Sequence, residues 1–148
     1  MLVPELDVAD LATSLRFYVH VLDFRVLFER PAERFAYLER SGVELMLQAA
    51  AGPGRRFRTA ALEYPYGRGV NFQLRVEDVD AMHARAVEAG CDIVVAIEAR
   101  WYRVDVAQSG GRWRKTGRIE VGNRQFVVAD PDGYLWRPFR DLGERAAV

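Results

Sequence analysis

The chain has 148 residues, a size typical of one domain, and half of them are hydrophobic, 28% charged and 11% aromatic. This composition excludes disordered and fibrous proteins, and no apolar run approaches the roughly 18 residues of a membrane-spanning helix. Because 21 basic residues balance 21 acidic ones, the molecule as a whole does not attract nucleic acid. The single cysteine, Cys91, cannot form an internal disulfide, and the first residues lack the regions of a signal peptide. We therefore expect a cytoplasmic protein that binds neither nucleic acid nor membranes.

The first third of the chain predicts one strand, one helix and three further strands. Alternating apolar and polar residues predict a strand at 2–8, and Asp10 is suited to cap a helix over 10–22. Three strands are expected after it, the last two joined by a Ser-Gly hairpin turn, at about 24–29, 34–40 and 43–49. Residues 51–67 have the composition of a linker.

The second part of the chain repeats this order. A strand is expected at 71–76, followed by a helix over 78–90 that Asp78 caps and Gly90 closes in the left-handed conformation. Three strands complete the copy, at about 92–98, 122–129 and 134–139. The predicted pattern is therefore strand, helix and three strands, twice.

The two copies also align in sequence, but at two different offsets. Val8–Leu11 matches Val76–Val79 at an offset of 68, whereas the segments 34–47 and 125–138 match at an offset of 91. The second copy thus holds an insertion of 91 − 68 = 23 residues between Asp78 and Phe126, where the segment from Trp101 to Gly122 sits. We predict a long loop between Glu98 and Gly122 that covers a binding site as a lid, or else serves as a solvated loop or a dimer arm.

This repeat, with Asp130-Pro131-Asp132-Gly133-Tyr134 before its last strand, resembles the vicinal oxygen chelate superfamily of glyoxalase I, extradiol dioxygenases and bleomycin-resistance proteins. Residues 123–134 and 43–47 are most similar to the bleomycin-resistance branch. The resemblance covers nearly the whole chain. It implies one α+β domain over 1–148, in which two tandem βαβββ modules (about 1–50 and 68–142) form a curved mixed sheet with a concave groove. It also implies a homodimer whose grooves are completed by both chains.

Side-chain alternation predicts which residues enter that groove. Alternate residues of a strand point to opposite faces of the sheet. In these strands the residues of one face are apolar and should pack against the helices, whereas those of the other face are a mixture of polar, charged and aromatic residues. Aromatic rings offer stacking surface, and amide and guanidinium groups can orient a polar ligand. The expected ligand-binding residues are Phe35, Tyr37, Met46, Gln48, Asn71, Gln73, Trp101 and Arg137.

The resemblance implies a metal site at four equivalent strand positions, but the residues there do not suit a metal. These positions hold Val3, Met46, Asn71 and Arg137. None is a carboxylate, imidazole or thiolate, so we expect neither a metal nor another cofactor. The only histidines, His20 and His83, fall in the predicted helices, and Asp130 and Asp132 are expected to accept hydrogen bonds from the local backbone of their turn.

Three functions remain open at this point. The first is an antibiotic-like small-molecule binding protein of the bleomycin-resistance type, which sequesters its ligand in the groove without a metal. The second is a metal-independent lyase, isomerase or hydrolase, with Glu5, Asp7 or Glu44 as the base and Arg75 or Arg137 as an electrophilic clamp. The third is a regulatory module whose groove is filled by its own loop. The sequence does not identify the ligand.

Overall fold

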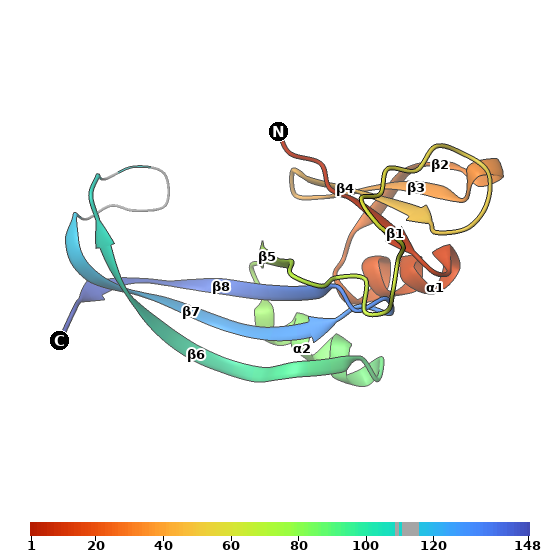
Figure 1. Ribbon diagram of the computed structural model, residues 1–148. Helices are drawn as coiled ribbons and strands as arrows, with labels where there is room; N and C mark the ends of the chain where they lie inside the picture. Colours follow the sequence, from red (N-terminus) through yellow and green to blue (C-terminus); the bar gives the residue numbers. More distant parts are fainter. Residues whose placement is uncertain (109, 111–115) are drawn as a thin grey trace.

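The computed structural model describes residues 1–108, 110 and 116–148, and it consists of two four-stranded mixed sheets (Figure 1). The first sheet has the order β1-β4-β3-β2, with β1 parallel to β4. Its module comprises β1 (Glu5–Val8), α1 (Leu11–Arg16), the π-helical turn η1 (Phe17–Val21), β2 (Arg25–Arg30), the 3₁₀ turn η2 (Pro31–Glu33), β3 (Phe35–Arg40) and β4 (Val43–Ala49).

The second sheet repeats this topology in the order β5-β8-β7-β6, with β5 parallel to β8. Its module comprises β5 (Asn71–Arg75), α2 (Val79–Glu88), β6 (Asp92–Val106), β7 (Gly117–Ala129) and β8 (Leu135–Ala146). The predicted α+β fold of two βαβββ modules is thereby confirmed. None of the helices in the described ranges is long and apolar enough to cross a membrane.

The helix ends form as the sequence predicts. Asp10 and Asp78 each accept a hydrogen bond at 2.9 Å from the backbone N–H three residues later. Gly90 closes α2 with a positive φ of 69°, and Asp23 follows η1 with a φ of 63°. The first helix differs in one respect: its last turn widens, because the N–H of Leu22 bonds to the carbonyl of Phe17.

A single hydrophobic core joins the two modules. The apolar face of each sheet is buried in this core, as expected, together with the inner faces of α1 and α2. At its centre Trp136 of β8 packs edge-on against Tyr18 and Phe24 of the first module, with ring centroids 5.7 and 6.0 Å apart. Core packing therefore fixes the position of one sheet relative to the other.

The turn between β7 and β8 is the polar link between the modules. Asp130 accepts hydrogen bonds from the N–H groups of Asp132 and Tyr134 at 3.0 and 2.8 Å, and from the hydroxyl of Tyr18 at 2.7 Å. Asp132 instead reaches the first module, where it accepts from the N–H of Ala9 at 2.9 Å and the hydroxyl of Ser14 at 3.2 Å. The expectation of local bonding is right for Asp130 and wrong for Asp132.

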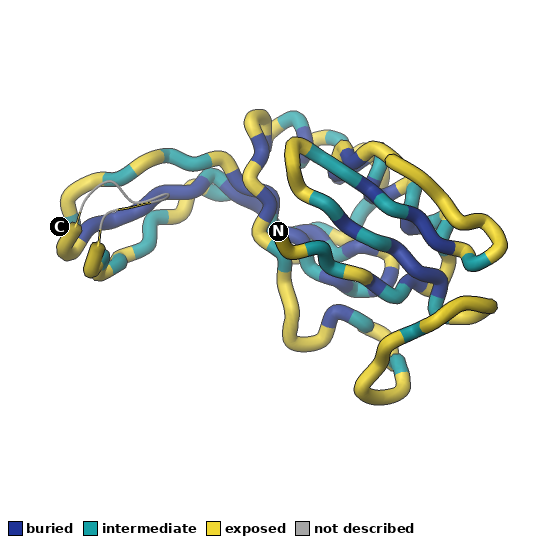
Figure 2. Tube along the Cα trace, turned by 90° about the horizontal axis from the view of Figure 1, so that it is seen from above, coloured by how far each residue is buried: buried dark blue, intermediate teal, exposed yellow. Residues whose placement is uncertain are grey.

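The predicted loop between Glu98 and Gly122 is wrong over most of its length. β6 continues to Val106 and β7 begins at Gly117, and with the end of β8 they form a curved ribbon that projects from the rest of the molecule as an arm (Figures 1 and 2). Tyr102, Val104 and Val106 alternate with charged residues, which is a strand pattern. Residues 109 and 111–115 of the predicted loop lie outside the described part of the chain.

Trp101 is a structural part of this arm. Its ring lies so close to Gly122 that a Cβ there would stand 2.8 Å from the ring. The guanidinium of Arg145 covers the ring, 3.9 Å from its centroid, and is bonded in turn to Glu120 at 2.7 Å. Trp101 is therefore held between β7 and β8 rather than on a lid.

Candidate functional site

Each sheet has one face covered by helix and one that is not, and we call the second its open face. In Figure 1 the open face of the second sheet is the concave one, opposite α2. The expected ligand-binding residues other than Trp101 divide between the two open faces: Phe35, Tyr37, Met46 and Gln48 on the first sheet, and Asn71, Gln73 and Arg137 on the second. One chain thus does not bring the two sets together.

The open face of the first sheet carries an aromatic pair that the sequence analysis missed in part. Phe28 of the edge strand β2 is 50% exposed and stacks on Tyr37, with ring centroids 5.0 Å apart and planes inclined by 17°. The hydroxyl of Tyr37 donates a hydrogen bond to Glu44, which raises the pKa of the phenol. Phe35 is buried beneath the guanidinium of Arg30. Alternation along β2 could not have indicated Phe28, because a register shift between Val26 and Phe28 brings its ring beside Tyr37.

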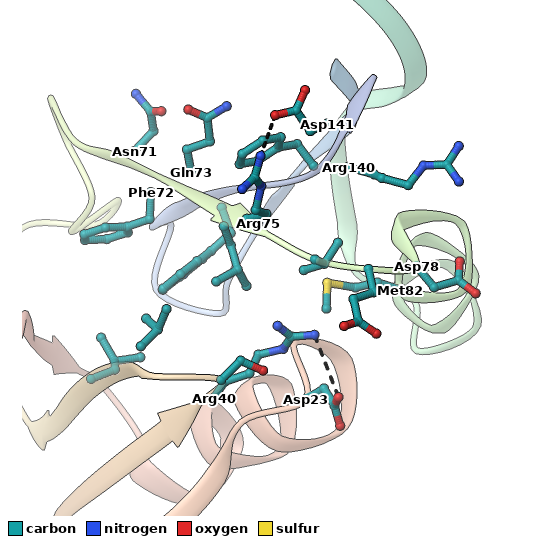
Figure 3. Close-up of a pocket in the computed structure, with 18 of the residues that line it drawn as sticks. Asp23, Arg40, Asn71, Phe72, Gln73, Arg75, Asp78, Met82, Arg140 and Asp141 are labelled. Carbon is teal, nitrogen blue, oxygen red and sulfur yellow. Dashed lines mark hydrogen bonds and ion pairs between the residues drawn. The ribbon is translucent and has the colours of Figure 1, made fainter. Parts of the chain in front are cut away.

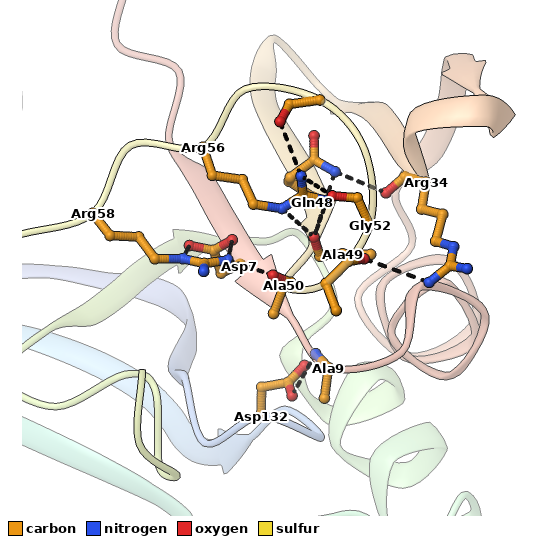
Figure 4. Close-up of polar contacts among 12 residues, drawn as sticks. Asp7, Ala9, Arg34, Gln48, Ala49, Ala50, Gly52, Arg56, Arg58 and Asp132 are labelled. Carbon is orange, nitrogen blue, oxygen red and sulfur yellow. Dashed lines mark hydrogen bonds and ion pairs between the residues drawn. The ribbon is translucent and has the colours of Figure 1, made fainter. Parts of the chain in front are cut away.

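The linker after β4 occupies another part of this face (Figure 4). The guanidinium of Arg58 forms a bidentate ion pair with the carboxylate of Asp7, at 2.8 and 3.0 Å. The guanidinium of Arg56 donates hydrogen bonds to backbone carbonyls, including that of Ala49. Gln48 is 2% exposed, and its amide nitrogen donates to the carbonyl of Glu33 at 2.7 Å. Gln48 and Asp7 are therefore engaged by the chain itself, which argues against Asp7 as a general base.

The open face of the second sheet holds polar atoms without partners. Arg137 is partly buried, and its Nε atom has no hydrogen-bond partner among the described residues. Gln125, 4% exposed, donates from its amide nitrogen to the hydroxyl of Tyr102 at 2.7 Å, whereas its Oε1 accepts no bond from the described chain. Because buried polar groups are normally satisfied, both atoms stand out on this face.

A cleft of about 1140 Å³ opens beside this face, between the two modules (Figure 3). Asn71 and Gln73 extend from one side of β5, and Phe72 extends from the other (Figure 3). Arg40 and Asp23, 3.9 Å apart, line the opposite wall in the first module. The cleft therefore follows the free edge of β5 and is mixed in polarity.

The four positions at which the resemblance implies metal ligands do not fit a metal. Val3, Met46, Asn71 and Arg137 provide no imidazole, thiolate or carboxylate, and Arg137 brings a positive charge instead. Elsewhere within residues 1–108, 110 and 116–148, no group of three or more His, Cys, Asp or Glu residues is placed to hold a metal ion. We therefore derive no chemistry through a metal.

Other reactive groups do not form a catalytic arrangement. Cys91 is partly buried, and burial raises the pKa of its thiol, which disfavours the nucleophilic thiolate. Glu44 accepts the hydrogen bond of Tyr37. His20 lies on η1 and His83 on α2, where the imidazole of His83 packs edge-on against Phe126. Neither histidine lies on an open face.

Comparisons with known proteins agree with this architecture. A family model described as "Glyoxalase/Bleomycin resistance protein/Dioxygenase superfamily" matches residues 4–137. The uncharacterized protein Mb0911c of Mycobacterium bovis is 30% identical, with 94% of this chain and 84% of the relative aligned. The crystal structure of TioX from Micromonospora sp. ML1 is 27% identical, with a TM-score of 0.64 over 95% of this chain and 98% of that one. Virulence protein STM3117 from Salmonella typhimurium, 18% identical with a TM-score of 0.63 over 95% and 94% of the two chains, shares the fold.

Proposed function

Since the chain belongs to the glyoxalase/bleomycin resistance/dioxygenase superfamily, we propose that it binds a small organic molecule on its open faces, without a metal, and sequesters it unchanged. Members of this superfamily bind small ligands and often form dimers. The observation that carries the proposal is the open face of the second sheet, where Arg137 and Gln125 present polar atoms with no partner in the described chain. A ligand with matching polar groups would satisfy them.

The division of the expected site residues supports a homodimer as the binding form. Tyr37 and Met46 of one copy and Asn71, Gln73 and Arg137 of the other would then enclose the ligand. Two features favour such pairing. The strands β1 and β5 each have a free edge, and the edge strand β2 exposes apolar side chains at Val26, Leu27 and Phe28.

We therefore expect light scattering at micromolar concentration to give twice the chain mass of 16.8 kDa. Replacing Phe28 by Asp should shift the equilibrium toward monomers, because a charge would enter the paired surface. The exposed Arg55, which lies outside the sheets, provides a control whose replacement by Ala leaves the dimer intact. A wild-type protein that remains monomeric would contradict this arrangement.

A second experiment tests sequestration without a metal. The purified protein is incubated with a small-molecule extract of its host, with and without EDTA. Native mass spectrometry then measures the mass of any bound molecule. We expect the same molecule in both samples, with the same mass after its release. Loss of binding in EDTA would contradict metal independence, and a changed mass would favour the metal-independent enzyme.

A further inference from the structure

We propose that the bound molecule is an organic anion, with its charged group at Arg137 and a flat apolar body along β8; this inference rests on the proposed function. Two other arginines of the second sheet are paired with carboxylates. Arg75 is neutralised by Asp141 at 2.5 Å on the open face, and Arg124 by Asp80 on the helix-covered face. No carboxylate in the described chain pairs with Arg137 in this way.

The position of Arg137 leaves its Nε atom buried without an acceptor among the described residues. Arg137 is partly buried near the start of β8, a strand that is paired on both sides, by β5 and by β7. A guanidinium removed from water without an acceptor is destabilising, so such groups are normally paired. A carboxylate, sulfonate or phosphate group would supply the acceptor, and guanidinium binds these groups through paired hydrogen bonds.

The surroundings of Arg137 indicate the rest of the molecule. On the same face of β8, Leu135 precedes it and Phe139 follows it, each two residues away. Gln73 of β5 lies directly beside it in the register of the sheet, and β7 places Val127 on the other side. Gln73 and Phe139 also line the cleft of about 1140 Å³ between the modules, whereas Arg137 lies beside it on the open face. An apolar ring would therefore contact Leu135, Val127 and Phe139 while its charged substituent met Arg137.

Two fluorescent probes with the same ring system test this inference. 8-Anilino-1-naphthalenesulfonate carries a permanent negative charge, and N-phenyl-1-naphthylamine lacks the sulfonate. We expect wild-type protein to bind the sulfonate at least tenfold more tightly. Arg137→Gln should abolish this preference: the affinity for the sulfonate probe should fall at least tenfold, and the affinity for the neutral probe should change less than twofold. Arg137→Lys, which keeps the charge, should retain most of the preference. Arg100→Gln removes an equal charge from the exposed part of β6 and should leave both probes unchanged.

The outcomes separate the two proposals. If both probes bind and Arg137→Gln affects neither, or both equally, the ligand is not an anion held by Arg137, and the proposed binding function still stands. If Arg137→Gln weakens the dimer in the absence of probe, the acceptor of Arg137 is a carboxylate of the second copy, which overturns the anion site. If wild-type protein binds neither probe, the open face does not bind flat organic molecules, and both proposals fail.

Discussion

Replacing Asp130 by Ala should lower the free energy of unfolding by about 4 kcal/mol, measured by urea denaturation. The carboxylate is 4% exposed and accepts three hydrogen bonds, two from backbone N–H groups of its turn and one from the hydroxyl of Tyr18. All three donors would lose their acceptor in a buried place, and each such loss costs roughly 1–3 kcal/mol. Because Tyr18 also receives the indole N–H of Trp136 at 3.1 Å, the centre of the core would be disturbed as well.

The matched control is Asp105→Ala on the arm. That carboxylate is exposed, and among residues 1–108, 110 and 116–148 its ion-pair partner is the exposed Arg118 at 3.4 Å, so a change below about 0.5 kcal/mol is expected. A similar loss for both variants would show that the turn does not join the modules as described.

The difference between wild type and Asp130→Ala should also depend on pH. Burial raises the pKa of Asp130 above that of the unfolded chain, so the folded state binds its proton more readily. The contribution of Asp130 to stability therefore falls as the pH rises from its pKa in the unfolded chain through its pKa in the folded protein. The difference in the free energy of unfolding between wild type and variant should be larger near pH 4 than at neutral pH. The partly buried Glu39 and the exposed Asp80 have pKa values lowered by their hydrogen-bond partners. Both are present in wild type and variant, so their contributions to the pH dependence cancel in the difference.

The fold could be predicted because the repeat, the helix caps and the strand parity are local patterns that agree with one another. Asp10 and Asp78 fix where the helices begin, and period-two alternation separates core from open face. The arm was missed for a physical reason. Its strands alternate, with Tyr102, Val104 and Val106 on one side, but the glycines and arginines around them have loop composition. Pairing of β6 with β7, and of β7 with the end of β8, decides in favour of the sheet.

For the candidate site, the alternation of residues along each strand predicts only which face of the sheet a side chain lies on. Alternation correctly placed Asn71, Gln73 and Arg137 on the same face of the second sheet. It could not show that Gln48 bonds to the carbonyl of Glu33 in η2, or that the linker engages Asp7. The path of a linker is set by contacts far along the chain, such as that of Arg58 with Asp7 across 51 residues. Nor could alternation show that the two sets of residues lie on separate sheets.

Replacing Gly67 by Ala should destabilise the protein by about 3 kcal/mol, because the loop before β5 packs directly on the turn that joins the modules. The N–H of Tyr66 bonds to the carbonyl of Asp132 at 2.8 Å, and a Cβ at Gly67 would stand 2.5 Å from the carbonyl oxygen of Gly133 and 2.6 Å from the Cα of Tyr134. These are backbone atoms, so they can move only if the turn moves. Gly69→Ala is the matched control: a Cβ there meets nothing within 4 Å, and only its φ of 80° is unfavourable, so we expect a loss of about 1 kcal/mol. Thermal and urea unfolding of both variants measures the difference, and equal losses would show that the close approach at Gly67 does not hold the loop on the turn.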